Sequence, residues 1–254
     1  MRLNRLEKKI VNHIQEISKC NQRGGRMLSI VDLINANTLD KKMAAYFLAT
    51  ISKGISFFVG SKPGGSGKTT IMGALLNFIP DVDIIPVESK STIDEAFQSR
   101  VRKCYLAHEI GYGSYYAYIS GENTENFLEL SNNHIIVSNL HADNIDDILD
   151  HEGINNANLK NINLLIFVNM IINRSLSRRI DSIYENQGGS NMKIAFKKIF
   201  EWDNKSDLFK MINKSKLINE KEISKAEKII DQMIKIGLKT IREIRTFVLE
   251  RFIH

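Results

Sequence analysis

The sequence of 254 residues predicts an α/β fold with a mostly parallel sheet, and three observations lead to this fold class. Short apolar runs alternate along the chain with segments in which apolar residues recur every three or four positions. A glycine-rich turn joins one apolar run directly to a helical segment. The length suits one sizeable core with smaller flanking parts. Strands that alternate with helices favour a parallel sheet covered on both faces.

The first part of the chain, residues 1–54, is predicted to be a helical N-terminal segment. Leu6, Ile10, Ile14 and Ile17 follow one another at three- and four-residue steps, which predicts a helix over residues 1–20. A second, short helix is expected over residues 29–34. Thr38 is expected to cap a third helix over residues 39–52 that ends at Gly54.

The central part, residues 55–186, is predicted to be the α/β core. Apolar runs bounded by turn residues predict strands over residues 55–59, 82–87, 104–110, 134–140 and 164–168. Helices are expected from the glycine-rich turn to about residue 78, and over residues 93–102. This order places helices between successive strands, as a parallel sheet requires.

The last part, residues 187–254, is expected to be a small, mainly helical C-terminal module. Residues 178–184 and 194–200 have the pattern of edge strands at the border of this part. Residues 220–252 carry apolar side chains at helical spacing, with a break at Gly237.

Composition and charge narrow the class of protein. A hydrophobic content of 43% with 25% charged residues is typical of a folded globular protein and excludes a wholly disordered chain. The net charge is +6, but Lys and Arg are scattered among Asp and Glu, so no direct nucleic-acid binding is expected. Cys20 and Cys104 lack the spacing of a disulfide framework or a zinc site. The charged N-terminus and the short apolar run at residues 162–172 favour a cytoplasmic protein without a membrane span.

The glycine-rich turn has the chemistry of a phosphate-binding loop. Its glycines let backbone N–H groups turn inward, the following helix adds a positive dipole, Lys68 can reach the β- and γ-phosphates, and Thr69 can ligate Mg²⁺. The predicted nucleotide-binding residues are Pro63, Gly64, Gly65, Ser66, Gly67, Lys68, Thr69 and Thr70. Lys62 stands where the motif has its first glycine. The alternative, a flexible surface turn, is disfavoured because the segment lies between a buried strand and a helix.

The residues around this loop resemble the secretion ATPase family of type II and type IV systems, which powers pili, archaella, protein secretion and DNA conjugation. The likeness is closest to the archaeal branch, and it covers about residues 28–185. It is carried by residues 30–34, Thr38, residues 44–46 and residues 69–80. The resemblance implies a RecA-like P-loop NTPase core that uses ATP and Mg²⁺.

The resemblance also implies partners. Relatives form rings, often hexamers, that act at the cytoplasmic face of a membrane platform protein. Self-association into a ring, and a place in the cytoplasm or at the inner face of the membrane, are therefore expected. Only about 50 residues precede the loop. A minimal version of the motor is thus expected, with its hexamer and its arginine contacts between subunits left open.

Three carboxylates are candidates for the catalytic site. The resemblance makes Glu88 a carboxylate near Mg²⁺ or the attacking water, although Ser89 replaces the usual Asp; a solvated strand-end Glu is the alternative. Two residues compete for the carboxylate that follows a hydrophobic strand and orients water or Mg²⁺. Glu109 is favoured because it follows Arg100 and Arg102, and Glu122 has the family's Gly-Glu pair.

Residues 134–142 are similar to the family's histidine box. The resemblance makes His141 a sensor of the γ-phosphate or a contact between subunits, next to the nucleotide. His134, at the other end of the same predicted strand, is expected to pack in the structure.

Three functions follow from these patterns. The first is an ATPase that powers secretion or the assembly of a pilus or archaellum. The second, motivated by Lys62 and Ser89, is a nucleotide-binding regulatory or scaffold protein with weak or no hydrolysis. The third is a P-loop enzyme such as a kinase, for which the sequence shows no second basic substrate site.

Overall fold

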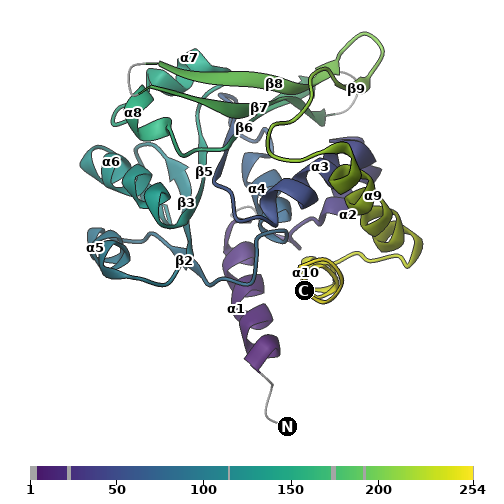
Figure 1. The fold of residues 1–254 in the computed structure, drawn as a ribbon, viewed down its shortest axis with the longest axis horizontal. Helices are drawn as coiled ribbons and strands as arrows, with labels where there is room; N and C mark the ends of the chain where they lie inside the picture. The colour runs from purple at the N-terminus through teal and green to yellow at the C-terminus, as the bar shows by residue number, and fades with distance from the viewer. Residues whose placement is uncertain (1–4, 22–23, 114, 173–175, 191–192, 254) are drawn as a thin grey trace.

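The computed structural model describes residues 5–21, 24–113, 115–172, 176–190 and 193–253 and confirms the α/β class. One nine-stranded sheet runs through the molecule in the order β2-β3-β5-β1-β6-β7-β8-β9, with β4 paired to the end of β3 (Figure 1). The strands are β1 (Phe57–Gly60), β2 (Ile84–Pro86), β3 (Cys104–Ile110), β4 (Tyr118–Ile119), β5 (Ile135–Leu140), β6 (Leu164–Ile172), β7 (Leu176–Ser190), β8 (Lys193–Asp203) and β9 (Leu208–Met211).

Ten α-helices and one 3₁₀ helix of the described residues precede, separate and follow these strands. They are α1 (Arg5–Lys19), α2 (Ile30–Asn35), α3 (Lys41–Ile51), α4 (Lys68–Leu76), α5 (Lys90–Gln98), α6 (Glu122–Glu129), α7 (Ile145–Leu149), α8 (Asn156–Leu159), α9 (Glu220–Lys235), α10 (Ile241–Arg251) and the short 3₁₀ helix η1 (Leu130–Asn132). The predicted N-terminal helix is thus present, although residues 1–4 lie outside the described part of the chain.

The parallel half of the sheet contains the strands that lead to the predicted site. β1 lies between β5 and β6, and β3 lies between β2 and β5, all in parallel pairs. Gly60 is level with Leu140, and Ile110 is also level with Leu140. The carboxyl ends of β1, β3 and β5 therefore meet at one edge, where ligands of open α/β sheets bind.

The other half of the sheet is antiparallel, and here two expectations are wrong. β6, β7, β8 and β9 pair in antiparallel order. Residues 178–184 and 194–200 therefore belong to interior strands, because β7 lies between β6 and β8, and β8 lies between β7 and β9. The edge strand of this half is β9, for which the sequence analysis predicted no strand. Its alternately exposed and half-buried residues lack an apolar run.

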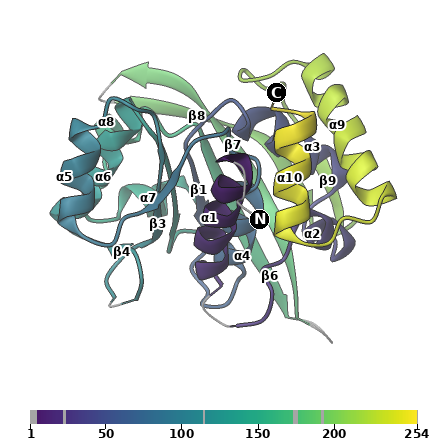
Figure 2. The ribbon, with the colours of Figure 1, turned by 90° about the horizontal axis from the view of Figure 1, so that it is seen from below.

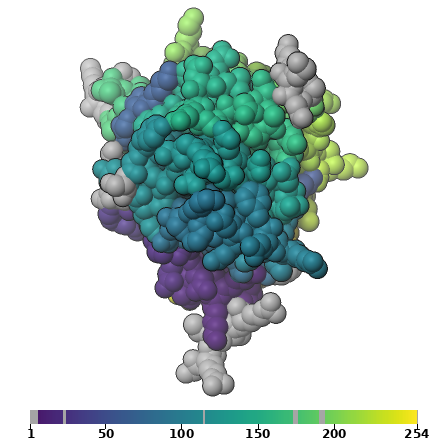
Figure 3. Space-filling model, turned by 90° about the vertical axis from the view of Figure 1, so that its left-hand side faces the viewer, coloured from purple at the N-terminus to yellow at the C-terminus, as the bar shows by residue number. Residues whose placement is uncertain are grey.

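Two layers of helices cover the sheet (Figure 2). Helices α1, α2, α3, α4, α9 and α10 pack on one face, in a core that includes Phe57 and Val59 of β1. Helices α5, α6, α7 and α8 pack on the other face, where Phe58 points. Successive residues of a strand point to opposite faces, so β1 contributes to both cores. The second layer dominates the side of the molecule seen in Figure 3, with α1 below it.

One predicted cap is wrong. The side chain of Asp40, and not Thr38, accepts the Met43 N–H and begins α3. Thr38 instead lies in the turn between α2 and α3, where its carbonyl accepts the N–H of Ile180 from β7.

The C-terminal helices end and begin as expected around Gly237, which has a positive φ of 74°. The core that lies under α9 and α10 is shared with α1–α4, and the expected boundary between residues 186 and 187 falls inside β7. The three-part division of the chain stays a prediction. Of the helices in the described ranges, none has both the length and the apolar character that crossing a bilayer needs.

Candidate functional site

The phosphate loop starts at Gly60, where the end of β1 passes very close to its neighbours. A Cβ atom at this position would lie 2.5 Å from the Ala142 carbonyl oxygen and 3.0 Å from the Phe167 ring. Only glycine allows this approach without a shift of backbone. The segment after β5 is therefore packed directly against the start of the loop.

The loop ends at Gly67, which begins α4. Its φ of +94° is unfavourable for any residue with a side chain, and no side chain caps the helix. The first N–H groups of α4 are consequently available to an anion, as at other helix N-termini. Residues 64–71 line a cleft of ≈ 550 Å³ at this point. Of the predicted nucleotide-binding residues, Gly64 to Thr70 line the cleft, whereas Pro63 is exposed and does not.

Lys68 points into this cleft although it is only 6% exposed. Its ammonium group donates a hydrogen bond to the Ser61 carbonyl at 2.8 Å and lies 3.7 Å from Glu109 Oε1. Burial lowers the pKa of Lys68, and the neighbouring Glu109 carboxylate partly offsets that effect. A buried ammonium with one carboxylate nearby can still gain from a second anion.

Glu109 occupies the carboxyl end of β3 and is 4% exposed. Its Oε1 atom lies 2.9 Å from His141 Nε2, and its Oε2 atom accepts a hydrogen bond from the Tyr118 hydroxyl at 3.2 Å. β4 brings Tyr118 there by pairing with the end of β3 at Glu109. The carboxylate is therefore held in the cleft from three sides, by Lys68, His141 and Tyr118.

His141 follows β5 directly, and its side chain is 51% exposed. Its Nε2 faces Glu109, and its Nδ1 lies 3.0 Å from the Lys62 carbonyl oxygen. A neutral imidazole can donate to only one of these two oxygens. The ring thus bridges the carboxylate and the phosphate loop, at the mouth of the cleft.

Lys62, the departure from the motif, is anchored to the segment after β5. Its backbone N–H donates to Asp143 Oδ1 at 2.7 Å, and its ammonium pairs with Asp147 Oδ1 at 2.7 Å. The ion pair holds the pKa of the Asp147 carboxyl below its usual range. The backbone of Lys62 thus contacts Asp143 through its N–H and His141 through its carbonyl, so the loop is held in place here without a glycine.

The other two predicted carboxylates lie outside the cleft. Glu88 is exposed beyond β2, and its carboxylate interacts with Tyr116. Glu122 is exposed at the first residue of α6. His134 packs far from the loop, with Nε2 3.0 Å from the Ala96 carbonyl oxygen, as expected for a structural residue. Of the predicted catalytic residues, the structure brings together Lys68, Glu109 and His141.

Several lining residues were missed by the sequence interpretation. Arg178 and Leu176 come from β7, Tyr118 comes from β4, and Arg26 and Leu28 come from the segment before α2. No local pattern marks them, because each reaches the cleft through pairing or packing with a distant part of the chain. Arg178 contacts Gly65, which is 113 residues earlier.

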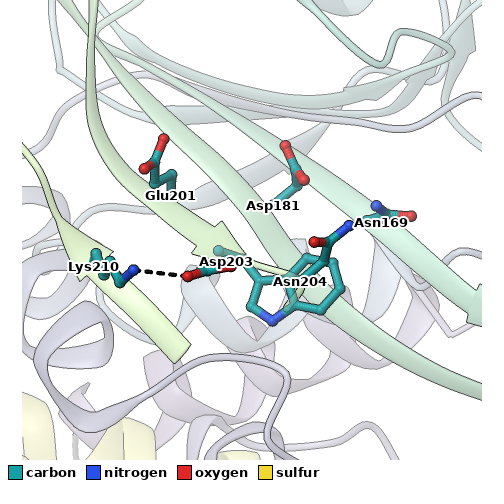
Figure 4. Close-up of a pocket in the computed structure, with 7 residues that line it drawn as sticks. Asn169, Asp181, Glu201, Asp203, Asn204 and Lys210 are labelled. Atoms are coloured by element: carbon teal, nitrogen blue, oxygen red, sulfur yellow. Dashed lines mark hydrogen bonds and ion pairs between the residues drawn. The ribbon is translucent and has the colours of Figure 1, made fainter. Parts of the chain in front are cut away.

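A second hollow, of ≈ 340 Å³, lies on the antiparallel half of the sheet (Figure 4). It contains none of the predicted site residues. Asp181, Glu201 and Asp203 line it, and Asp203 pairs with Lys210 at 2.7 Å, which holds the pKa of that carboxyl below its usual range. Within the described residues, no group of three or more His, Cys, Asp or Glu side chains could hold a metal ion.

Two ATPases are among the solved structures that this chain resembles. The VirB11 ATPase from the Brucella suis type IV secretion system, in complex with sulphate, matches with a TM-score of 0.44 and 15% identity, over 61% of this chain and 54% of that chain. The Legionella pneumophila ATPase DotB matches with a TM-score of 0.37 and 10% identity, over 85% of this chain and 65% of that chain. This chain therefore spans less than two thirds of either neighbour.

A type IV secretion ATPase is thus among the structural neighbours. Comparison with family models and with curated proteins finds no match. At this level of similarity we base the function of the chain on its own residues.

Proposed function

We propose that this chain is an ATPase that binds ATP with Mg²⁺ in the cleft around the phosphate loop and hydrolyses it. One observation supports the proposal above others. A buried lysine at the start of α4, a buried carboxylate at the end of β3 and a histidine just after β5 face one another across a single cleft. Phosphoryl transfer requires such a positive cradle beside a carboxylate that can act on water.

The loop and Lys68 bind the phosphates. The N–H groups of residues 64–69 form the concave, positive surface, and the α4 dipole adds to it. In the structure the Lys68 ammonium is held by the neutral Ser61 carbonyl and by Glu109. The same ammonium donates a stronger, charge-assisted hydrogen bond to the oxygen of a bound phosphate.

The residues of the cleft suit Mg²⁺ as a partner of the nucleotide. Mg²⁺ is usually held by one or two protein oxygens together with phosphates and water, and not by a protein cage. The Thr69 hydroxyl lines the cleft, and Glu109 is the carboxylate there. When bound, Mg²⁺ neutralises charge that develops on the phosphate oxygens. Thr69 and Glu109 are the residues that would hold it.

Glu109 and His141 act on the reacting end of the nucleotide. Glu109 orients the attacking water by accepting a hydrogen bond from it, since its buried carboxylate lines the same cleft as the loop. The His141 ring lies within 3.0 Å of both the Lys62 carbonyl oxygen and Glu109 Oε1, so it is placed to sense whether a terminal phosphate is present. Glu88 and Glu122, which lie outside the cleft, have no role in this scheme.

The finer function follows from the resemblance of the residues around the loop to the secretion ATPase family. We propose that the chain powers a secretion, pilus or archaellum-type machine as a ring of identical subunits, with a hexamer as the first candidate. It would work in the cytoplasm, against a platform protein at the inner face of the membrane. Light scattering in the presence of ATP and Mg²⁺ tests the ring, and a monomer under these conditions would argue against it.

Release of inorganic phosphate from ATP tests the activity itself. Lys68→Ala should abolish release while the far-ultraviolet circular dichroism stays unchanged. Lys62→Ala is the matched control, because it removes a lysine from the same loop whose ammonium pairs with Asp147 at the surface. Undiminished turnover by Lys68→Ala would contradict the proposal.

A nucleotide-binding regulatory protein with weak hydrolysis is the second candidate. It is favoured by the fact that Glu109 alone of the three predicted carboxylates lines the cleft, where Lys68, His141 and Tyr118 already engage it. Calorimetric binding of ATP combined with turnover measurement separates the two functions. Binding without turnover, unchanged by Glu109→Gln, would support the regulator. Turnover that Glu109→Gln abolishes would support the ATPase.

A further inference from the structure

Arg178 connects the antiparallel half of the sheet to the phosphate loop. It lies near the start of β7, and its Nε and Nη2 atoms both donate to the Gly65 carbonyl oxygen, at 3.1 and 2.8 Å. Its aliphatic stem covers Gly67, where an added Cβ atom would lie 2.7 Å from Arg178 Cδ. The side chain therefore crosses the loop directly beside the N-terminus of α4.

The charge of Arg178 is not matched by a carboxylate. Among the described residues, the arginine and lysine side chains that line the cleft are Arg26, Lys68 and Arg178. Arg26 makes a two-pronged ion pair with Asp32, at 2.6 and 2.7 Å, and Lys68 lies near Glu109. Within the same ranges, the Arg178 guanidinium donates only to the neutral Gly65 carbonyl, and its Nη1 has no hydrogen-bond partner. A guanidinium in this state gains from an anion bound in the loop.

The two arginines before β3 lie away from the loop. Arg100 and Arg102 precede β3, where the resemblance placed the family's arginine-containing helix. In the structure Arg102 donates to the carbonyl of Gly54, which precedes β1 and thus lies at the amino ends of the parallel strands, opposite the loop. Arg100 is exposed and also precedes β3, at the same end of the strands. Among the residues that the structure describes, Arg178 is thus the arginine of the cleft without a carboxylate partner, and it comes from the same chain as the loop.

We propose that Arg178 is a nucleotide-binding residue that donates, from within the same chain, to the terminal phosphates of a nucleoside triphosphate. The inference rests on the proposed nucleotide site. Nε and Nη2 hold the loop by Gly65, and Nη1 extends toward the phosphates that the α4 N-terminus binds. The effect of this residue should therefore increase with the number of phosphates on the ligand.

Titration calorimetry with AMP, ADP and the non-hydrolysable β,γ-imido analogue of ATP tests the proposal, with Mg²⁺ and the full chain. Arg178→Gln should weaken binding of the triphosphate by about tenfold to a hundredfold, the range of one charge-assisted hydrogen bond. Binding of AMP should change by less than about threefold, within ordinary scatter of such contacts. Arg178→Lys, which keeps the charge, should fall between the wild type and Arg178→Gln.

Arg242→Gln is the control for loss of one positive charge, because Arg242 is exposed on α10. Equal weakening of all three ligands, or no weakening of the triphosphate by either Arg178 variant, would overturn the role of Arg178 and leave the nucleotide site intact. Failure of the wild-type chain to bind any of the three ligands would overturn the proposed function, and the role of Arg178 with it.

Discussion

Arg245 is the largest fully buried side chain of the protein as the structure describes it, and its replacement should be severely destabilising. From α10 its guanidinium donates to the backbone carbonyls of Asn77, Ile79 and Pro80, which follow the end of α4, and to His13 Nδ1 of α1. Burial lowers the pKa of Arg245 to about 10. This one side chain therefore joins the C-terminal helix, α1 and the end of α4.

The cost of Arg245→Met follows from these bonds. Methionine keeps much of the apolar volume but leaves three carbonyls without this donor, at about 1–3 kcal/mol for each buried polar group that stays unsatisfied. Removing the buried charge relieves desolvation and offsets part of that sum, and the contributions do not add fully. We expect a net loss of about 3–5 kcal/mol, because three unsatisfied carbonyls together cost more than the relieved desolvation returns. That is a large share of the ~5–15 kcal/mol that stabilises a typical domain.

Urea denaturation followed by circular dichroism measures this loss. Arg242→Met is the matched control, since Arg242 lies on the same helix and is exposed, and it should change stability by less than about 0.5 kcal/mol. A loss under about 1 kcal/mol in Arg245→Met would refute the reasoning, because it would mean that water or a shift of α10 satisfies the carbonyls.

Three further predictions use the same assays. Burial lowers the pKa of His13 from 6.5 to about 4, so the unfolded chain binds more protons than the folded chain between these pH values. The free energy of unfolding should therefore rise by about 3 kcal/mol as the pH increases over that window. Urea denaturation at pH 4.5 and 7 should show a smaller rise in His13→Gln than in the wild type. Gly60→Ala should cost about 1–3 kcal/mol by overpacking, whereas Gly64→Ala, where a Cβ meets nothing within 4 Å, should cost less than about 1 kcal/mol. Burial raises the pKa of both Cys20 and Cys104, so iodoacetamide should modify them only after unfolding, and rapid native alkylation would count against their burial.

Local patterns were enough for the elements that surround the loop. The predicted strand over residues 104–110 matches β3 in both bounds, because its seven residues are all buried and end at a turn. The caps were harder, because Thr38 and Asp40 are both good N-cap residues two positions apart. Asp40 prevails since its carboxylate reaches the Met43 N–H, whereas the Thr38 backbone is used by β7.

The site needed information that no local pattern carries. Glu109 and Glu122 both follow a short apolar run, and the pairing of β3 with β5 brings Glu109 to the same end of the sheet as His141, where their side chains lie 2.9 Å apart. Arg178 was interpreted as part of an edge strand. Its place at the loop depends on the parallel pairing of β1 with β6, the strand to which β7 is paired, and β1 and β6 lie far apart in the sequence, with Phe57 opposite Leu164. Long-range pairing of this kind is set by the whole sheet and not by neighbouring residues.

Two arginines from late in the chain contact the segments at both ends of α4. Arg178 of β7 binds the loop at its start, and Arg245 of α10 binds the carbonyls after its end. α4 has nine residues and spans roughly 13 Å. Because α4 begins with Lys68, the helix that carries the lysine of the phosphate cleft is fixed at one end by the antiparallel strands and at the other by the C-terminal helices.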